Sequence, residues 1–222
     1  MAKTYMGPNG GWIKKFGSSV GFRWKGIDVI RAYVKYVTNP DTDAQKLERE
    51  KFSVAGRLAG SFNQVCNLTM RRFATAKKTT PAGQFVKQAL AGAISGTLGH
   101  VEVDYEQLSV TAPDAGLTRV ALGEVDFGTP LTVSVAIDDA YTDTRFNSPD
   151  DKVYLVVYSK TDGTVIASDG TAKRTSENVS VRVPGYWQGH FVEVYAFVDA
   201  DALSQRAGMT SPTLYCGSGR IA

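Results

Sequence analysis

The chain has 222 residues, of which 43% are hydrophobic and 21% are charged. This is the composition of a globular protein with room for one large domain or two small ones. No run of about 18 apolar residues predicts a membrane span, and the first residues lack the apolar core of a signal peptide. We therefore expect cytoplasmic synthesis without a signal peptide, followed by residence in a cytoplasm-like compartment or in a virion. Cys66 and Cys216 are expected to be free thiols, since two cysteines make a poor disulfide framework.

The formal charge of +3 hides a split between the two halves of the chain. Residues 1–99 contain 16 Lys and Arg against 5 Asp and Glu, whereas residues 100–222 contain 9 against 17. A basic half attracts phosphates or acidic surfaces. A chain with one basic and one acidic end can also stack head to tail on its own copies. The simpler interpretation is two solvated faces of different sign.

Residues 1–38 are predicted to form a basic, aromatic β-arm behind a Gly-rich leader. Val20, Phe22 and Trp24 alternate with small or basic residues, a period of two that is typical of a half-buried strand. The alternation predicts that Phe22 and Trp24 face a core while Arg23 and Lys25 share the exposed face. An isolated hairpin is marginal in water, so the arm must pack on its own helices or on a neighbouring subunit.

Residues 39–99 are predicted to form a helical hairpin. Thr42 and Gln45 have the spacing of a capping box, and the helix that follows keeps an apolar stripe to about residue 75. Pro81 marks a break, after which a second helix is predicted over residues 82–95.

Residues 100–222 change to short alternating segments separated by turn residues. The stretch "KTDGT" (160–164) has the Asp-Gly pair of a tight hairpin. Seven or eight short strands predict an antiparallel β-sandwich, immunoglobulin/fibronectin-like. The predicted fold class is therefore α+β, with a β-arm (1–38), a helical hairpin (39–99) and a β-sandwich domain (100–222).

Several motifs resemble a functionally uncharacterised family of bacterial and phage proteins. They are "MAK" (1–3), "GSSVGFRWKG" (17–26), "VIR" (29–31), "NPDTDAQKLEREKF" (39–52) and, at the other end, "VEVYAFVDADALSQRAGMTSPTLYCG" (192–217). Similar segments occur in genes near phage structural modules, so the resemblance implies a virion or assembly role. It transfers no catalytic residues.

The sequence carries no catalytic signature. His100 and His190 are its two histidines, and it has no CxxC or HxxxH metal motif, no phosphate loop and no GxSxG nucleophile motif. The aspartates at 138–139, 143 and 150–151 are interpreted as solvated turn residues, because their spacing lacks the ligand order of a calcium loop. We predict a non-enzymatic protein without cofactor or metal.

Three functional hypotheses remain open. The first is a structural, self-assembling protein, such as a component of a phage virion or another particle. Its partners would be its own copies and other particle proteins. Subunit contacts are assigned to Trp12, Phe16, Phe22, Trp24 and Tyr33. The second is binding of DNA or RNA through Lys14, Lys15, Arg23, Lys25, Arg31, Lys35, Arg71 and Arg72. The third is a surface- or glycan-binding module that uses Tyr186 and Trp187 in the loop "PGYWQG" (184–189); a buried corner is the alternative role for these two aromatics.

Overall fold

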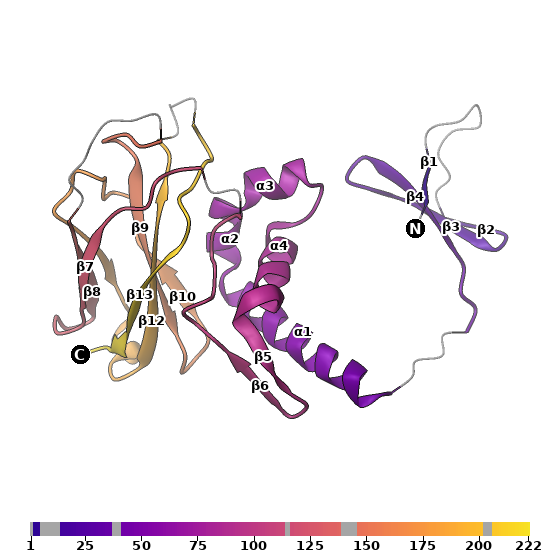
Figure 1. Cartoon of the computed structure of the whole chain (residues 1–222), viewed down its shortest axis with the longest axis horizontal. Helices are drawn as coiled ribbons and strands as arrows, with labels where there is room; N and C mark the ends of the chain where they lie inside the picture. Colours follow the sequence, from indigo (N-terminus) through magenta and orange to yellow (C-terminus); the bar gives the residue numbers. More distant parts are fainter. Residues whose placement is uncertain (1, 5–13, 37–40, 114–115, 139–145, 202–205) are drawn as a thin grey trace. The chain divides into compact units, whose positions relative to one another are not determined.

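A computed structural model describes residues 2–4, 14–36, 41–113, 116–138, 146–201 and 206–222 (Figure 1). Contacts divide the chain into two compact units, Met1–Gln45 and Lys46–Ala222. We call them the N-terminal unit and the main unit.

The N-terminal unit contains one antiparallel sheet with the strand order β1-β4-β3-β2. Its strands are β1 (Ala2–Thr4), β2 (Lys14–Phe16), β3 (Ser19–Trp24) and β4 (Ile27–Ala32). Lys25 and Gly26 join β3 to β4 with positive φ angles of 47° and 76°, as a two-residue turn between twisted strands requires. The predicted strand character of the arm is confirmed.

The pairing register sorts the side chains of this sheet onto two faces. Phe22 lies opposite Val29, and Trp24 lies opposite Ile27. Directly opposed residues of antiparallel strands share a face, as do residues two apart along a strand. We call one side the aromatic face, and its members are Lys15, Val20, Phe22, Trp24, Ile27, Val29, Arg31 and Tyr33.

The helices follow as α1 (Asp43–Ser61), α2 (Asn63–Thr69), α3 (Arg71–Ala76) and α4 (Pro81–Gln88). The backbone N–H of Gln45 donates to Thr42 Oγ1 at 3.4 Å, which confirms the Thr42 half of the predicted capping box. The return bond from the Gln45 side chain is not made, because its Oε1 is buried without a hydrogen-bond partner among the described residues. The single helix predicted to residue 75 is instead divided at Phe62 and Met70 into α1, α2 and α3. Sequence periodicity did not reveal these divisions because the apolar stripe continues through them.

The second predicted helix is shorter than expected. Thr80 caps α4 by accepting a hydrogen bond from the Gly83 N–H at 3.0 Å. A π-helical turn, η1 (Ala89–Ala93), follows, and the chain then forms the hairpin of β5 (Ile94–Thr97) and β6 (His100–Val103). The prediction of helix to residue 95 is therefore wrong at its end.

Two antiparallel sheets complete the main unit, with strand orders β10-β9-β12-β13 and β11-β8-β7. Their strands are β7 (Leu122–Asp126), β8 (Thr132–Ile137), β9 (Lys152–Ser159), β10 (Val165–Ala167), β11 (Asn178–Arg182), β12 (Phe191–Asp199) and β13 (Leu214–Arg220). The short 3-10 helix η2 (Gly185–Trp187) precedes β12. The β9–β10 pairing confirms the hairpin predicted at "KTDGT".

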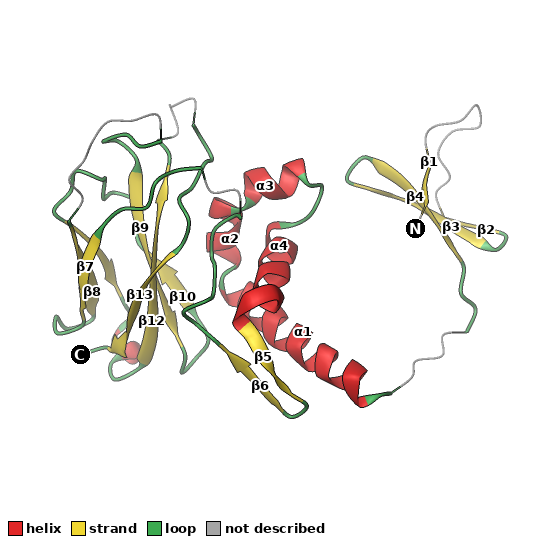
Figure 2. Cartoon of the chain, viewed as in Figure 1, coloured by secondary structure: helices red, strands yellow, loops and turns green. Residues whose placement is uncertain are grey.

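The four-stranded sheet is buried on both faces. On one face, Tyr158 of β9 packs with Phe62, at 5.3 Å between ring centroids, in a core shared with the helices. On the other face, Leu155 and Val157 belong to a second core together with Val133 of β8. The main unit is therefore layered as helices, four-stranded sheet and three-stranded sheet (Figure 2).

The mixed α+β class with antiparallel sheets is confirmed. The sequence predicted residues 39–99 and 100–222 as two separate domains. In the structure, Lys46–Ala222 is one compact unit, because the helices and the four-stranded sheet share one apolar core. The division of the arm from the rest falls at residue 45 rather than 38. Among the described residues, no helix is long and apolar enough to cross a membrane.

Candidate functional site

The aromatic face of the N-terminal unit presents large rings and cations together. Trp24 and Tyr33 are each 44% exposed. Phe22, which lies opposite Val29 in the pairing register, is half-buried. The Lys15 ammonium lies 4.0 Å from the centroid of the Tyr33 ring. That distance is within the range of a cation–π interaction. The face therefore contains Trp24, Tyr33 and Arg31, the three residue types that most often dominate binding energy at interfaces.

The predicted layout of the arm is partly corrected. Arg23 does lie on the opposite face from Trp24, and its Nε is 3.7 Å from an Asp28 carboxylate oxygen. Trp24, however, is exposed rather than in a core. Lys25 lies in the turn with its ammonium 5.5 Å from the Trp24 ring centroid, so it accompanies the aromatic residue instead of sharing a separate basic face with Arg23.

The remaining candidates of the arm have different placements. Trp12 lies outside the described residues, and of Phe16 only the backbone, in β2, is described. Lys14, Arg31 and Lys35 are exposed. Arg71 and Arg72 are exposed at the start of α3, in the main unit.

The loop predicted to bind a glycan contains one buried and one exposed aromatic residue. Trp187 is fully buried, and its indole N–H donates to Asp162 Oδ2 at 3.1 Å. Tyr186 is 67% exposed. Trp187 is thus a corner residue of the core and cannot stack on a sugar, which removes half of that candidate site.

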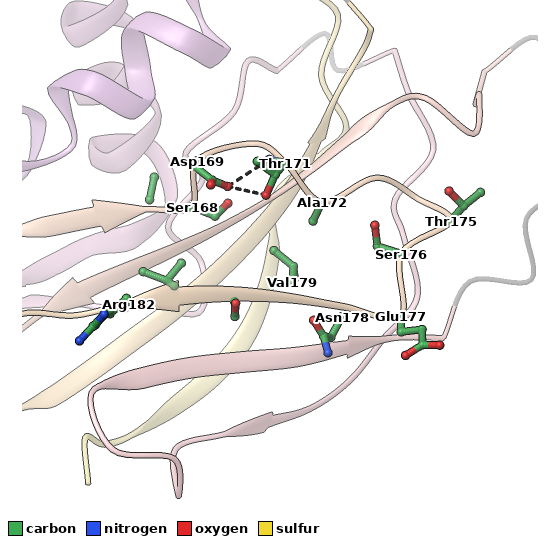
Figure 3. A pocket seen from close by; sticks show the side chains of 13 residues that line it. Ser168, Asp169, Thr171, Ala172, Thr175, Ser176, Glu177, Asn178, Val179 and Arg182 are labelled. Carbon is green, nitrogen blue, oxygen red and sulfur yellow. Dashed lines mark hydrogen bonds between the residues drawn. The ribbon is translucent and has the colours of Figure 1, made fainter.

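A groove of about 840 Å³ runs along the edge strand β11 (Figure 3). One wall is β11 itself, and the other is the segment 167–176 that leads away from β10. In Figure 3 the acidic Glu177 and the basic Arg182 lie at opposite ends of this stretch. Asp169 is held within its own turn, because the Thr171 hydroxyl donates to its Oδ1 at 2.7 Å. The sequence did not predict this groove, because its walls belong to two different sheets: β11 to the three-stranded sheet, and the segment after β10 to the edge of the four-stranded sheet.

Comparison with protein-family models matches residues 11–208 to DUF6266, described as a family of unknown function. The chain belongs to the DUF6266 family. This agrees with the resemblance to a functionally uncharacterised family. No curated protein matches the sequence.

One cluster of this DUF6266 chain contains the residue types of a serine hydrolase. Ser159 Oγ is 3.1 Å from His190 Nδ1, and Asp162 Oδ1 is 3.9 Å from the same nitrogen. In a catalytic triad the acid and the serine use different ring nitrogens. Ser159 is also fully buried. This trio therefore joins the β9–β10 hairpin to the residues after η2 and does not form a nucleophile–base relay.

Hydrogen bonding also fixes the ionisation of Asp162. Burial pushes its pKa upward, but hydrogen bonds from Ser159 and Thr164 outweigh that effect, and the net pKa lies below the ordinary value. An ionised Asp162 keeps accepting the hydrogen bond of the Trp187 indole. The role of this carboxylate is thus structural in the DUF6266 fold.

Sequence reasoning also missed a buried polar group between the helices and the four-stranded sheet. Glu193 is buried, with its carboxylate 2.8 Å from the Lys160 ammonium and 2.6 Å from the Tyr215 hydroxyl, which donates to it. Burial, followed by the hydrogen bond to Glu193, raises the pKa of Tyr215 to about 12. A tyrosine held neutral in this way remains a hydrogen-bond donor over the whole physiological pH range.

The interpretation of the paired aspartates is wrong for Asp151. Its side chain is fully buried and accepts hydrogen bonds from the Arg206 guanidinium at 3.1 Å and from the Ser148 N–H at 2.8 Å. Arg174, also buried, places its Nε 3.6 Å from the same carboxylate. These partners come from distant parts of the chain, so local spacing could not predict the cluster. Among the residues that the structure describes, no group of three or more His, Cys, Asp and Glu could hold a metal ion.

Proposed function

We propose that this protein is a non-enzymatic assembly protein whose N-terminal unit docks on a neighbouring copy through the aromatic face. The observation that carries the proposal is the joint exposure of Trp24 and Tyr33 on that face. Aromatic side chains that give up their hydration on docking contribute large shares of binding energy at interfaces.

The layering of the N-terminal unit supports this role. Its described strands form a single sheet, and a sheet with an apolar side needs a second layer to bury that side. The half-buried Phe22 and Ile27 and the exposed Trp24 supply the apolar surface beside the buried Val29, and Lys15 and Arg31 border it. In the proposed assembly the second layer comes from another copy, and the cations face its acidic side chains.

A virion component is the particle role that we favour. The resemblance to phage proteins supports it, as does the unequal charge of residues 1–99 and 100–222, which favours head-to-tail contacts between copies. We further propose that residues 122–220 are an immunoglobulin/fibronectin-like sandwich. In chain order, the sheet β11-β8-β7 corresponds to strands E-B-A, and β10-β9-β12-β13 corresponds to C′-C-F-G.

Sedimentation velocity tests the assembly role on the full, nuclease-treated chain. The variant Trp24→Ser/Tyr33→Ser is expected to sediment as a smaller species than the parent protein at high and low salt. The matched control is Tyr186→Ser, which removes an exposed aromatic residue of the main unit and is expected to leave the sedimentation coefficient unchanged. A parent protein that is monomeric at all concentrations contradicts the proposal.

Nucleic-acid binding is the second candidate, because Lys15, Lys25 and Arg31 lie on or beside the aromatic face. Bases can stack on exposed rings while cations contact phosphates. On this alternative, the chain binds single-stranded DNA with an affinity that falls steeply with salt. Lys15→Ala/Arg31→Ala then lowers the salt slope by about 1.4, because each phosphate contact on a single strand contributes about 0.7. Arg23→Ala, whose guanidinium is paired with Asp28 on the other face, is the matched control.

A further inference from the structure

The lateral edges of the main unit differ in how they are closed. At one side, β7 and β13 lie against each other, and the Phe127 ring packs so closely on Gly219 that an added Cβ would be 2.5 Å from its Cε2 atom. The register of β7 with β8 is also shifted there, as in a β-bulge. Bulges and packed side chains are the usual protection of a sheet edge against further pairing.

Strand β11 lacks both kinds of protection. Its five residues pair with β8 in unbroken register, from Asn178 opposite Ala136 to Arg182 opposite Thr132. Within the described part of the chain, no strand pairs with its other side. The groove of about 840 Å³ follows all five residues of this open edge (Figure 3).

The hydrogen bonds of the β8–β11 pair show which backbone groups point into the groove. The Ile137 N–H donates to the Glu177 carbonyl, and the Val183 N–H donates to the Leu131 carbonyl, each at 2.9 Å. Because hydrogen-bonded pairs alternate along an antiparallel ladder, Val179 and Val181 also bond toward β8. The N–H and C=O groups of Asn178, Ser180 and Arg182 therefore point outward, and among the described residues they have no partner.

The side chains of β11 make this edge self-complementary about Ser180. In an antiparallel pair of two copies centred on Ser180, each Ser180 meets the other, and Asn178 meets Arg182 of the second copy. On the inner side, the buried Val179 meets Val181 of the second copy, which extends the apolar core across the junction. On the outer side, the exposed Asn178 and Arg182 of the second copy share one face, where the Asn178 side-chain carbonyl can accept a hydrogen bond from the Arg182 guanidinium.

We propose that β11 is a homotypic interface at which two copies of this chain join their three-stranded sheets around a two-fold axis through Ser180. The pairing satisfies every outward backbone group of Asn178, Ser180 and Arg182. Two-fold contacts of this kind are the commonest in soluble oligomers. The interface belongs to the main unit, and it does not depend on the contact proposed for the aromatic face.

A charge-swap experiment tests the two-fold axis, because a residue on the axis faces its own copy. Ser180→Asp and Ser180→Arg, each alone, place like charges opposite each other. Each variant is expected to lose the β11 contact and to sediment as a smaller species than the parent chain. An equimolar mixture of the two is expected to regain the parent sedimentation coefficient. Failure of the mixture to recover, or single variants that match the parent chain, would overturn the proposal.

Disulfide cross-linking provides a second readout that does not require a disruptive variant. A two-fold pair holds two Ser180→Cys thiols together at an effective concentration in the millimolar range, so at ~10 µM protein the oxidised dimer should form ~100-fold faster than by random collision. Ser218→Cys, at an exposed position of β13 on the protected side, is the matched control. Equal rates for the two variants would overturn the proposal. Loss of assembly in Trp24→Ser/Tyr33→Ser without loss of this cross-link separates the two interfaces.

Discussion

The Lys160 ammonium and the Glu193 carboxylate form a 2.8 Å ion pair beside the helical layer, and Glu193 is buried while Lys160 reaches solvent. Lys160 also lies 4.4 Å from the centroid of the Tyr105 ring. Removing the ammonium leaves a buried carboxylate with a missing partner. Lys160→Met is therefore expected to lower the free energy of unfolding by ~1–3 kcal/mol, measured by urea denaturation.

The exposed ion pair of Lys173 and Asp150 provides the control for that variant. Its two atoms are 2.7 Å apart, but both side chains are at least half exposed. Solvent screens such a pair, so Lys173→Met should change the free energy of unfolding by less than about 1 kcal/mol. Equal losses in the two variants would show that burial of Glu193 has no energetic role.

Gly219 is expected to tolerate no side chain. A Cβ there would overlap the Phe127 ring, and the packing of β7 on β13 would have to open. Gly219→Ala should cost ~1–3 kcal/mol in thermal or chemical unfolding. At Gly185, the nearest atom to an added Cβ is 3.9 Å away, so Gly185→Ala should stay within about 0.5 kcal/mol of the parent protein. A neutral Gly219→Ala variant would mean that β7 and β13 are loosely packed.

Asp199 is expected to make stability depend on pH. Burial raises its pKa from 3.8 to about 6, against the opposing effect of Lys152. Between about pH 4 and pH 6, the Asp199 carboxyl therefore keeps its proton in the folded state and loses it in the unfolded state. The resulting stabilisation is complete below pH 4 and is lost as the pH rises through 6. Asp199→Asn should show a smaller loss of unfolding free energy between pH 4 and pH 7 than the parent protein, and an equal or larger loss would contradict the assignment.

The two cysteines should be unreactive in the folded protein. Both are free, and burial raises the pKa of each thiol to about 12. At pH 8 their thiolate fraction is then ~1000-fold below that of an ordinary thiol. Labelling with Ellman's reagent should be slow for Cys66 and Cys216 in the native chain and fast for both in guanidinium chloride. Fast native labelling of either thiol would show that its surroundings open readily.

Local patterns in the sequence predicted the local structure well. The period of two around Phe22 and Trp24 predicted strands, Thr42 predicted a helix start, and the Asp-Gly pair at 162–163 predicted a hairpin, all of which are present. Each depends on residues a few positions apart. The interpretation of Cys66 as a free buried thiol likewise needed only its apolar surroundings.

Features that depend on distant residues were not predictable in this way. The partners of Asp151 lie at residues 174 and 206. The partner of Trp187 is Asp162 in the turn between β9 and β10, and those of Glu193 are Lys160 in the same turn and Tyr215 on β13. The exposure of Trp24 and the open edge of β11 follow from which strands become neighbours. A single sequence does not specify those neighbours, so the groove beside β11 required the structure.

The most direct test of the central claim is photo-cross-linking from position 24 in the full chain. A benzophenone amino acid replaces Trp24, with the same substitution at the exposed Tyr186 as the control. The proposed assembly predicts covalent dimers from position 24, with cross-links to residues of a second copy, and few or none from position 186. Cross-links from position 24 that fall only within the same chain would show that the N-terminal unit packs on its own molecule, and would contradict the assembly role.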